Sequence, residues 1–270
     1  MSDDAEESDW QDVTLDRSTL QAQFDLTGRT AIVTGGTRGI GMAIAEGLAG
    51  LGANVAVASR KAEACAMAAE RLQSLGAAAV GVPTHLGDLT AINILVDTTL
   101  AQFGGIDIIV NNAANPLAQN LGEFTPEAWQ KSFAVNLQGP VFLVQAALPH
   151  LRTSAHAAIL NVVSAGAFIF SPMVSMYSAA KAAMVSFTRS MAAEFASDRI
   201  RVNALAPGSV DTDMVRKNPP EFITAMATSA LMQRIATTEE MVPPAMLLVS
   251  DAGSFITGQT LIVDGGMAAH

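Results

Sequence analysis

The 270-residue sequence has little of several features that mark particular classes of protein. It contains one cysteine, Cys65, so an internal disulfide framework is excluded and a reducing, cytoplasmic setting is expected. A run of about 18 apolar residues is absent, so no membrane-spanning helix is expected. The acidic N-terminus lacks an apolar core segment and does not have the pattern of a secretory signal.

Basic residues are also scarce, with 15 Lys and Arg against 25 Asp and Glu, for a net charge of −10. Residues 1–25 hold eight of the acids and one base, Arg17. Phosphate backbones attract basic patches, so nucleic-acid binding is not expected, and we predict no metal site. We interpret residues 1–26 as an acidic extension, either a solvated tail or a docking arm, and residues 27–270 as one domain.

Half of the residues are hydrophobic, and they recur as short β-branched runs separated by longer helical stretches. Strands are expected at Thr30–Thr34, Asn54–Ser59, Ala78–Val82, Asp107–Val110, Ala158–Val163, Arg201–Leu205 and Thr260–Val263. Helices are expected over 40–50, 62–75, 90–103, 125–150, 176–196 and 239–249. This alternation is typical of βαβ units. It predicts a single-domain, doubly wound α/β Rossmann fold with a seven-stranded parallel sheet flanked by helices.

A glycine-rich segment, 34–41 (TGGTRGIG), lies between the first expected strand and the first expected helix. Glycines permit a tight turn and let the backbone approach a pyrophosphate. The start of the helix adds unpaired N–H groups and a positive dipole end. This context predicts a dinucleotide site. Its candidate residues in the turn are Gly35, Thr37, Arg38, Gly39 and Ile40.

The end of the second strand indicates which dinucleotide binds. Enzymes that use NAD place an acidic residue there to hold the ribose 2′-hydroxyl. Here that position is Ser59, followed by Arg60 and Lys61. No carboxylate would repel a 2′-phosphate, and a guanidinium can pair with one through two hydrogen bonds. Arg38 lies in reach of the same phosphate. We therefore predict NADP(H) as the cofactor.

A second group of residues points to acid–base chemistry. Tyr177 and Lys181 are four residues apart at the start of an expected helix, and Tyr177 is the only tyrosine in the chain. A nearby ammonium favours the phenolate, so Lys181 is expected to lower the pKa of Tyr177. Ser164 follows the fifth strand, at the edge where ligands of open α/β sheets bind. Its hydroxyl can donate to a substrate oxygen.

Taken together, these motifs resemble those of a classical short-chain dehydrogenase/reductase over about residues 27–266. The glycine spacing, Asn111-Asn112-Ala113-Ala114 after the fourth strand, and Asp264-Gly265-Gly266 near the end all match that family's pattern. The resemblance implies a catalytic tetrad and further cofactor contacts. The tetrad is Asn136, Ser164, Tyr177 and Lys181. The further cofactor contacts are His85, Leu86, Asn112, Ala113, Ala114, Pro207, Gly208, Val210 and Thr212, with Tyr177 and Lys181.

The resemblance also implies a role for each group. Tyr177 exchanges a proton with the substrate oxygen, and Lys181 binds the nicotinamide ribose. Ser164 polarises the carbonyl, and Asn136 holds a water that connects Lys181 to solvent. The chain departs from the pattern where His85-Leu86 replaces an aspartate that contacts adenine. There the imidazole is expected to hydrogen-bond an amino group instead.

We therefore expect an NADP(H)-dependent oxidoreductase that interconverts a small hydrophobic carbonyl and its alcohol. The Met- and Pro-rich segment 213–233 is a candidate lid over the site. A 3-oxoacyl-carrier-protein or 3-oxoacyl-CoA reductase is an alternative, because these motifs are shared with such enzymes. A non-catalytic NADP(H)-binding sensor or scaffold is another. Apolar helices over 125–150 and 176–196, with the resemblance, imply a homotetramer or homodimer.

Overall fold

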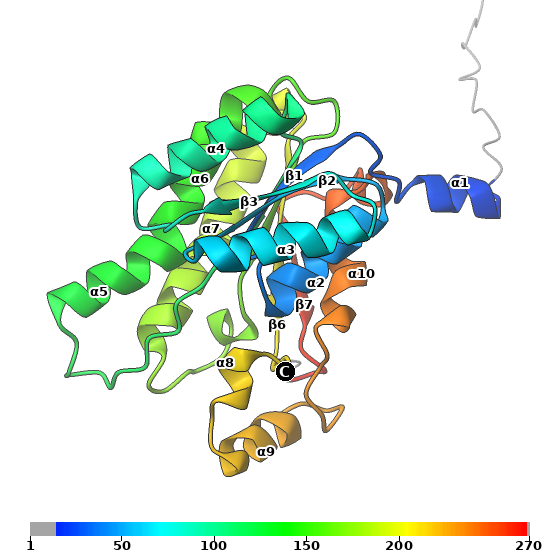
Figure 1. Cartoon of the computed structure of the whole chain (residues 1–270). Helices are drawn as coiled ribbons and strands as arrows, with labels where there is room; N and C mark the ends of the chain where they lie inside the picture. The colour runs from blue at the N-terminus through cyan, green and yellow to red at the C-terminus, as the bar shows by residue number, and fades with distance from the viewer. Residues whose placement is uncertain (1–14, 269–270) are drawn as a thin grey trace, which may run out of the picture.

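A parallel sheet of seven strands forms the centre of the computed structural model, which describes residues 15–268 (Figure 1). The strands lie in the order β3-β2-β1-β4-β5-β6-β7, and every neighbouring pair is parallel. Their bounds are Thr30–Thr34, Asn54–Ser59, Ala79–Pro83, Ile108–Asn111, Ala158–Val162, Arg201–Pro207 and Thr260–Val263 for β1 to β7. The order reverses between β1 and β4. This doubly wound α/β sheet confirms the predicted fold class.

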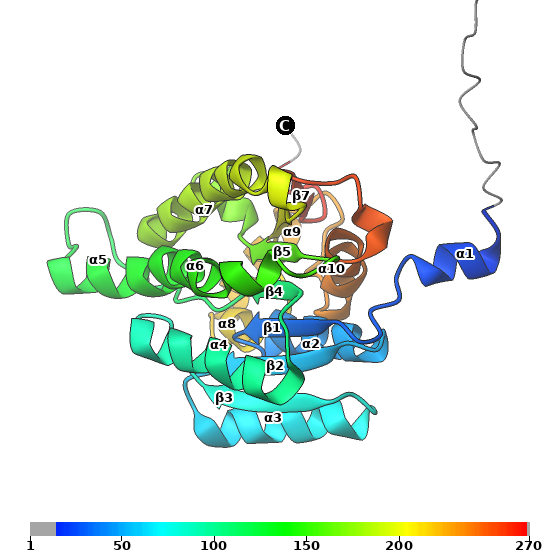
Figure 2. The same ribbon diagram turned by 90° about the horizontal axis from the view of Figure 1, so that it is seen from above.

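Helices cover both faces of the sheet, as Figure 2 shows from above. One face carries α2 (Gly39–Gly50), α3 (Ala62–Ser74) and α10 (Val242–Val249). The other carries α4 (Leu89–Phe103), α6 (Gly139–Leu151) and α7 (Ser175–Glu194). Because successive side chains of a strand point to opposite faces, β1 supplies Ala31 and Val33 to one core and Ile32 to the other. Burial on both faces explains the apolar runs of the strands.

The sequence predicts a single helix over 125–150, and this prediction is wrong. The structure has α5 (Pro126–Phe133), a π-helical turn η1 (Ala134–Gln138) and then α6. Thr125 caps α5 by accepting a hydrogen bond from the N–H of Ala128. Pro140, in the first turn of α6, has no N–H to donate. The segment around it therefore takes a wider turn, in which the N–H of Gly139 donates to the carbonyl of Ala134, five residues back.

The segment proposed as a lid contains two helices that the sequence analysis did not predict, α8 (Asp213–Arg216) and α9 (Pro220–Thr228). Both lie beyond the carboxyl ends of the strands, at the bottom of Figure 1. Another helix, α1 (Arg17–Ala22), falls within the acidic extension. Asp16 caps it, and none of its residues is buried. Residues 1–14 of that extension lie outside the described part of the chain, so the role of the extension and its boundary with the domain remain predictions.

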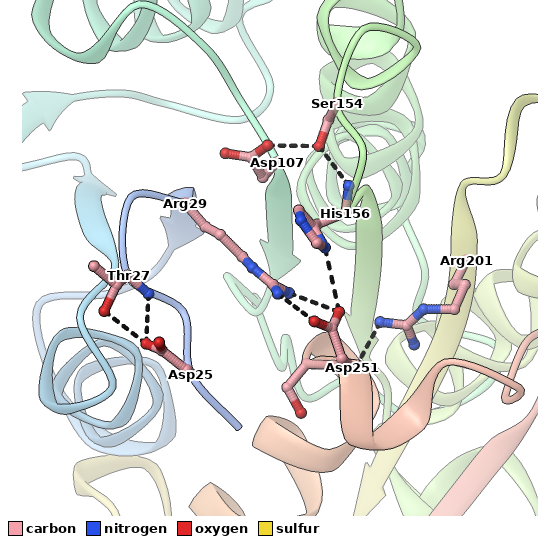
Figure 3. A network of polar contacts seen from close by, with 9 residues as sticks. Asp25, Thr27, Arg29, Asp107, Ser154, His156, Arg201 and Asp251 are labelled. Atoms are coloured by element: carbon pink, nitrogen blue, oxygen red, sulfur yellow. Dashed lines mark hydrogen bonds and ion pairs between the residues drawn. The ribbon is translucent and has the colours of Figure 1, made fainter. Parts of the chain in front are cut away.

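Polar side chains hold the opposite, amino-terminal edge of the sheet together (Figure 3). Arg29, which is buried, pairs with both carboxylate oxygens of Asp251 at 2.5 and 3.0 Å. Asp107 accepts hydrogen bonds from the N–H of Thr30 and the hydroxyl of Ser154. Arg201 donates to three backbone carbonyls at the end of α10 and just after it. The pair between Arg29 and Asp251 joins the chain before β1 to a segment 222 residues away.

Between residues 15 and 268, none of the helices combines the length and the apolar character needed to cross a membrane. In the same range, no three His, Cys, Asp or Glu side chains gather in a way that could hold a metal ion.

Candidate active site

A cavity of about 620 Å³ opens at the carboxyl ends of the strands. Its walls come from the turn after β1, the ends of β2 and β5, the loops after β3, β4 and β6, and the first turns of α7 and α8. It lies where the strand order reverses between β1 and β4, which is where open α/β sheets bind their ligands. Its volume falls in the range of small-molecule sites.

The glycine turn forms one wall, and its shape requires residues without side chains. Gly35 has a φ of +64°, and a Cβ atom there would lie 2.9 Å from the Cα of Ala113. Gly39 has a φ of +56° and begins α2. The first N–H groups of a helix have no partner within it, so the start of α2 presents donors and a positive dipole end to the cavity. The turn therefore fits a pyrophosphate.

Asn112 and Thr34 hold this turn in place. The amide of Asn112 donates to the carbonyls of Thr34 at 2.9 Å and Gly35 at 3.2 Å. The hydroxyl of Thr34 accepts from the N–H groups of Asn112 and Ala113 at 3.0 and 3.1 Å. The side chain of Asn112 is thus occupied in shaping the wall, while Ala113 and Ala114 expose small side chains to the cavity.

Three of the four groups predicted at the cofactor's 2′-phosphate line the cavity. Ser59 and Arg60 at the end of β2 do so, as does Arg38 at the start of α2. Lys61 is the residue just before α3 and lies outside the cavity. Arg38 forms an exposed ion pair with Asp213 on α8, with 3.2 Å between Nη1 and Oδ2.

His85 lies in the cavity wall in a fixed orientation. Its Nδ1 accepts a hydrogen bond from the N–H of Gly87 at 3.0 Å. A neutral imidazole that accepts at Nδ1 carries its proton on Nε2, which is then a donor. Such a ring suits an acceptor, such as a ring nitrogen of adenine. The amino group named in the sequence analysis is itself a donor, so that pairing does not fit the neutral ring.

Ser164, Tyr177 and Lys181 meet at the other end of the cavity. Ser164 follows β5 and accepts from the N–H of Gly166 at 3.1 Å. Tyr177 and Lys181 lie one turn apart on α7. The buried ammonium of Lys181 donates to the carbonyl of Val162 at 2.7 Å and lies 5.7 Å from the centre of the Tyr177 ring. β5 and α7 therefore place a phenol, an ammonium and a hydroxyl around one space.

Burial controls the acidity of this group. It raises the pKa of Tyr177, and a hydrogen bond with Ser164 opposes the effect in part. It lowers the pKa of Lys181 to about 8. The net direction of the Tyr177 pKa shift is therefore upward, because removal from water penalises the phenolate more than its neighbours favour it. The predicted lowering of this pKa by Lys181 remains a prediction.

Asn136 is buried in the π-helical turn η1 and does not line the cavity. Its side-chain oxygen accepts from the N–H of Asn115, and its amide donates to the carbonyl of the same residue, both at 2.8 Å. The amide also donates to Ser132 at 3.2 Å. Asn136 therefore fixes Asn115, which does line the cavity, and its predicted role in holding a water remains a prediction.

The loop after β6 closes the cavity on the nicotinamide side expected from the sequence. Pro207, Gly208, Val210 and Thr212 all line the cavity. A Cβ atom at Gly208 would lie 2.7 Å from the Cα of Asp264, so the loop packs closely on the segment after β7. Thr212 approaches the start of α2, where a Cβ atom at Gly39 would lie 3.2 Å from its methyl group.

The structure thus brings nearly all of the predicted site residues to one cavity. The exceptions are Lys61 and Asn136. The sequence analysis did not name several other residues of its lining, among them Lys131, Asp213, Met214 and Lys217. Three of these belong to α8 or its end, and the position of a one-turn helix has no periodic signal in the sequence. The specific role of each predicted residue remains a prediction.

Comparisons with known proteins give a consistent result. Residues 35–268 match the family model described as enoyl-(acyl carrier protein) reductase. The human protein named dehydrogenase/reductase SDR family member 4 is 35% identical over 260 residues, which are 95% of this chain and 94% of that protein. The cis-4-hydroxycyclohexanecarboxylate dehydrogenase of Sinomonas cyclohexanicum is 38% identical over 243 residues, 89% of this chain and 97% of that protein.

Solved structures show the same likeness. A gluconate 5-dehydrogenase from Burkholderia cenocepacia, in complex with NADP and tartrate, superimposes with a TM-score of 0.88 at 33% identity. The match covers 93% of this chain and 99% of that one. A short-chain type dehydrogenase/reductase from Mycobacterium marinum also has a TM-score of 0.88, at 30% identity over 92% of this chain and 98% of its own.

Proposed function

Because the chain belongs to the short-chain dehydrogenase/reductase family, we propose that it is an NADP(H)-dependent oxidoreductase that interconverts a carbonyl and an alcohol. The observation that carries the proposal is the convergence of Ser164, Tyr177 and Lys181 at one end of a cavity whose other end is the glycine turn. Members of this family use a nicotinamide cofactor, and the fit of the turn to a pyrophosphate agrees with that.

The cofactor supplies or accepts the hydride when bound, and the protein's part is placement and proton transfer. Tyr177 exchanges a proton with the substrate oxygen, and Ser164 donates a hydrogen bond to that oxygen. The bond from Lys181 to Val162 keeps a positive charge one helical turn from Tyr177. Asn136 fixes Asn115 in the cavity wall. Burial raises the pKa of Tyr177, so the phenol is protonated at neutral pH and can donate its proton when a carbonyl is reduced.

Two observations support NADP(H) over NAD(H). The end of β2 carries Ser59 and Arg60 in place of a carboxylate, and Arg38 lines the same cavity. A structural neighbour, the gluconate 5-dehydrogenase, was solved with NADP. His85, with its Nε2 proton, completes the adenine side by donating to a ring nitrogen.

Exposed apolar side chains in the segments that follow Ser164 and Thr212 support a small hydrophobic substrate, and Met214 among them lines the cavity. Phe168, Phe170 and Met173 follow Ser164, and Met214 and Phe222 belong to the proposed lid; all five are exposed. The alternative of an acyl-carrier substrate rests on motifs shared with such reductases, and an acidic carrier would need basic side chains near the site, such as Arg216 and Lys217. Arg216 is paired with Asp211 through two hydrogen bonds, at 2.7 and 2.9 Å, which leaves Lys217 for that role.

We also propose that the protein is cytoplasmic and forms a homodimer or homotetramer. The free thiol of Cys65 supports a reducing compartment. Trp129 on α5 and Phe187 on α7 are 48% and 40% exposed, and a second copy of the chain would cover such side chains. Light scattering coupled to gel filtration would give the number of subunits.

The test of function is a panel of aldehydes, ketones, sugars and 3-oxoacyl thioesters, followed by the absorbance of the reduced nicotinamide with NADPH and NADH in parallel. We expect turnover of apolar carbonyls with NADPH. Tyr177→Phe should reduce kcat by at least a hundredfold, because the proton donor is lost, and leave cofactor binding in place. The control is Ser178→Ala, since Ser178 is next in sequence and its buried hydroxyl has no hydrogen-bond partner within the described residues. Full activity of Tyr177→Phe would show that Tyr177 is not the proton donor, whereas cofactor binding without turnover of any substrate by the wild type would support a non-catalytic binding protein instead.

A further inference from the structure

The ion pair between Arg38 and Asp213 joins two parts of the cavity rim. Arg38 is the residue just before α2, and Asp213 is the first residue of α8. Both side chains line the cavity, and a single contact of 3.2 Å connects them. Arg38 is also one of the cations assigned to the cofactor's 2′-phosphate. This cation therefore already has an anionic partner within the protein.

We propose that Asp213 is a specificity-determining residue for the cofactor. In the free protein its carboxylate holds Arg38, and it gives up this guanidinium when a ribose 2′-phosphate arrives. The inference rests on the proposed function, since it takes NADP(H) as the cofactor. It goes further because it assigns to Asp213, in the proposed lid, an effect that weakens the binding of NADP and not that of NAD.

The strengths of the two contacts allow this exchange. The side chains of Arg38 and Asp213 are 68% and 54% exposed, and ion pairs between exposed side chains contribute little to stability. A phosphate accepts two parallel hydrogen bonds from one guanidinium and carries more charge than a carboxylate. It should therefore displace Asp213. Part of its binding free energy is then spent on breaking the ion pair, and Asp213 remains near by as a repelling charge.

The neighbouring charges on α8 do not replace this effect. Asp211, two residues before Asp213, lies outside the cavity and is bound to Arg216. Lys217, one turn after Asp213, lines the cavity and forms no ion pair with the described residues. Asp213 is thus the acidic side chain that meets the predicted phosphate-binding group. Asp211 offers the same charge two residues earlier in the chain without that contact.

The test compares Asp213→Asn with Asp211→Asn by calorimetric titration of oxidised NADP and NAD, which measures binding without turnover. The two ligands differ only in the 2′-phosphate. We expect Asp213→Asn to tighten NADP binding by about twofold to fivefold, the range that an exposed ion pair allows, and to leave NAD binding unchanged. Asp211→Asn should show no such selective gain. Because both carboxylates are exposed, both variants should fold.

Unchanged or weaker NADP binding by Asp213→Asn would overturn the inference. So would an equal gain for both ligands, since that is a general charge effect, or an equal selective gain in Asp211→Asn. If the wild type binds both dinucleotides and Asp213→Asn shows no selective gain for NADP, the result contradicts this inference alone. A wild-type protein that binds neither contradicts the proposed function as well.

Discussion

Lys181 places an ammonium group where water does not reach it, and this has a consequence for stability. Burial lowers the pKa of Lys181 from 10.5 to about 8 in the folded protein. Between these two values the unfolded chain holds a proton that the folded chain has released. Stability therefore rises with pH across this window, because the unfolded state binds more protons there. The full effect corresponds to about 3 kcal/mol.

We predict that the unfolding free energy of the cofactor-free wild type, relative to that of Lys181→Met, increases as pH rises from 7 to about 10. Urea unfolding at several pH values would measure it. The comparison with the variant is necessary, since burial raises the pKa of Cys65 and of Tyr177 and both groups lower stability at high pH. A constant difference between the two proteins would show that Lys181 is hydrated.

Single residues were predictable where a rule links residue type to position. Tyr177 and Lys181 follow from helical spacing, and Ser164 follows from the end of a strand. Lys61 was misplaced because consecutive residues at a helix start point in different directions, and only Arg60 turns into the cavity. The bond between Arg38 and Asp213 joins residues 175 positions apart, and no local pattern in the sequence predicts such a contact.

At the scale of elements, the start of α2 depends on close contact between backbones. A Cβ atom at Gly41 would collide with the carbonyl oxygen of Gly35 and with the amide of Asn112. At Gly50, in the last position of the same helix, it would meet nothing within 4 Å. A side chain is therefore excluded at Gly41 and has room at Gly50, although both glycines belong to one helix.

We predict that Gly41→Ala destabilises the protein by about 1–3 kcal/mol, because the glycine turn has to move, and that it also weakens cofactor binding. Gly50→Ala should stabilise the protein by about 0.5–1 kcal/mol, since alanine restricts the unfolded chain and favours the helix. Thermal unfolding and calorimetric cofactor binding would measure both. Normal cofactor binding in Gly41→Ala would mean that the turn does not shape the pyrophosphate site.

The bounds of an element were predictable where the spacing of its hydrophobic residues and the turn residues at its ends indicate the same limits. The bounds of β1, β2 and β7 match the expected ones, since each is a β-branched run between polar or glycine residues. The prediction of one helix over 125–150 was wrong because the spacing of apolar residues alone does not reveal a π-helical turn. The helices α8 and α9 were missed because Pro and Met in 213–233 favour no regular element, and contacts with the rest of the fold decide their structure.

At the scale of the whole molecule, α1 and the residues that follow it differ in how far they pack against the domain. No residue of α1 is buried, whereas Leu26 is fully buried in the core on the α2 face. Between them, the carbonyl of Gln23 accepts a hydrogen bond from Ala252 at 3.0 Å. The attachment of this segment to the domain therefore begins near residue 23.

We predict that a chain shortened to begin at Gln23 keeps the unfolding free energy and the kinetic constants of the full chain. Leu26→Ala should cost about 2–5 kcal/mol, the usual loss for a fully buried leucine. Urea unfolding and steady-state kinetics would measure both changes. A loss of activity on shortening, with stability intact, would point to a docking role for the acidic segment.

The single tyrosine of this chain lies in the candidate active site. Proteins usually contain several phenols, whose optical signals overlap and hide the one that reacts. In this protein every spectral change that comes from phenol ionisation originates at the reaction centre. The wild-type chain, without any label or substitution, therefore reports the protonation of its own proton donor in ultraviolet difference spectra.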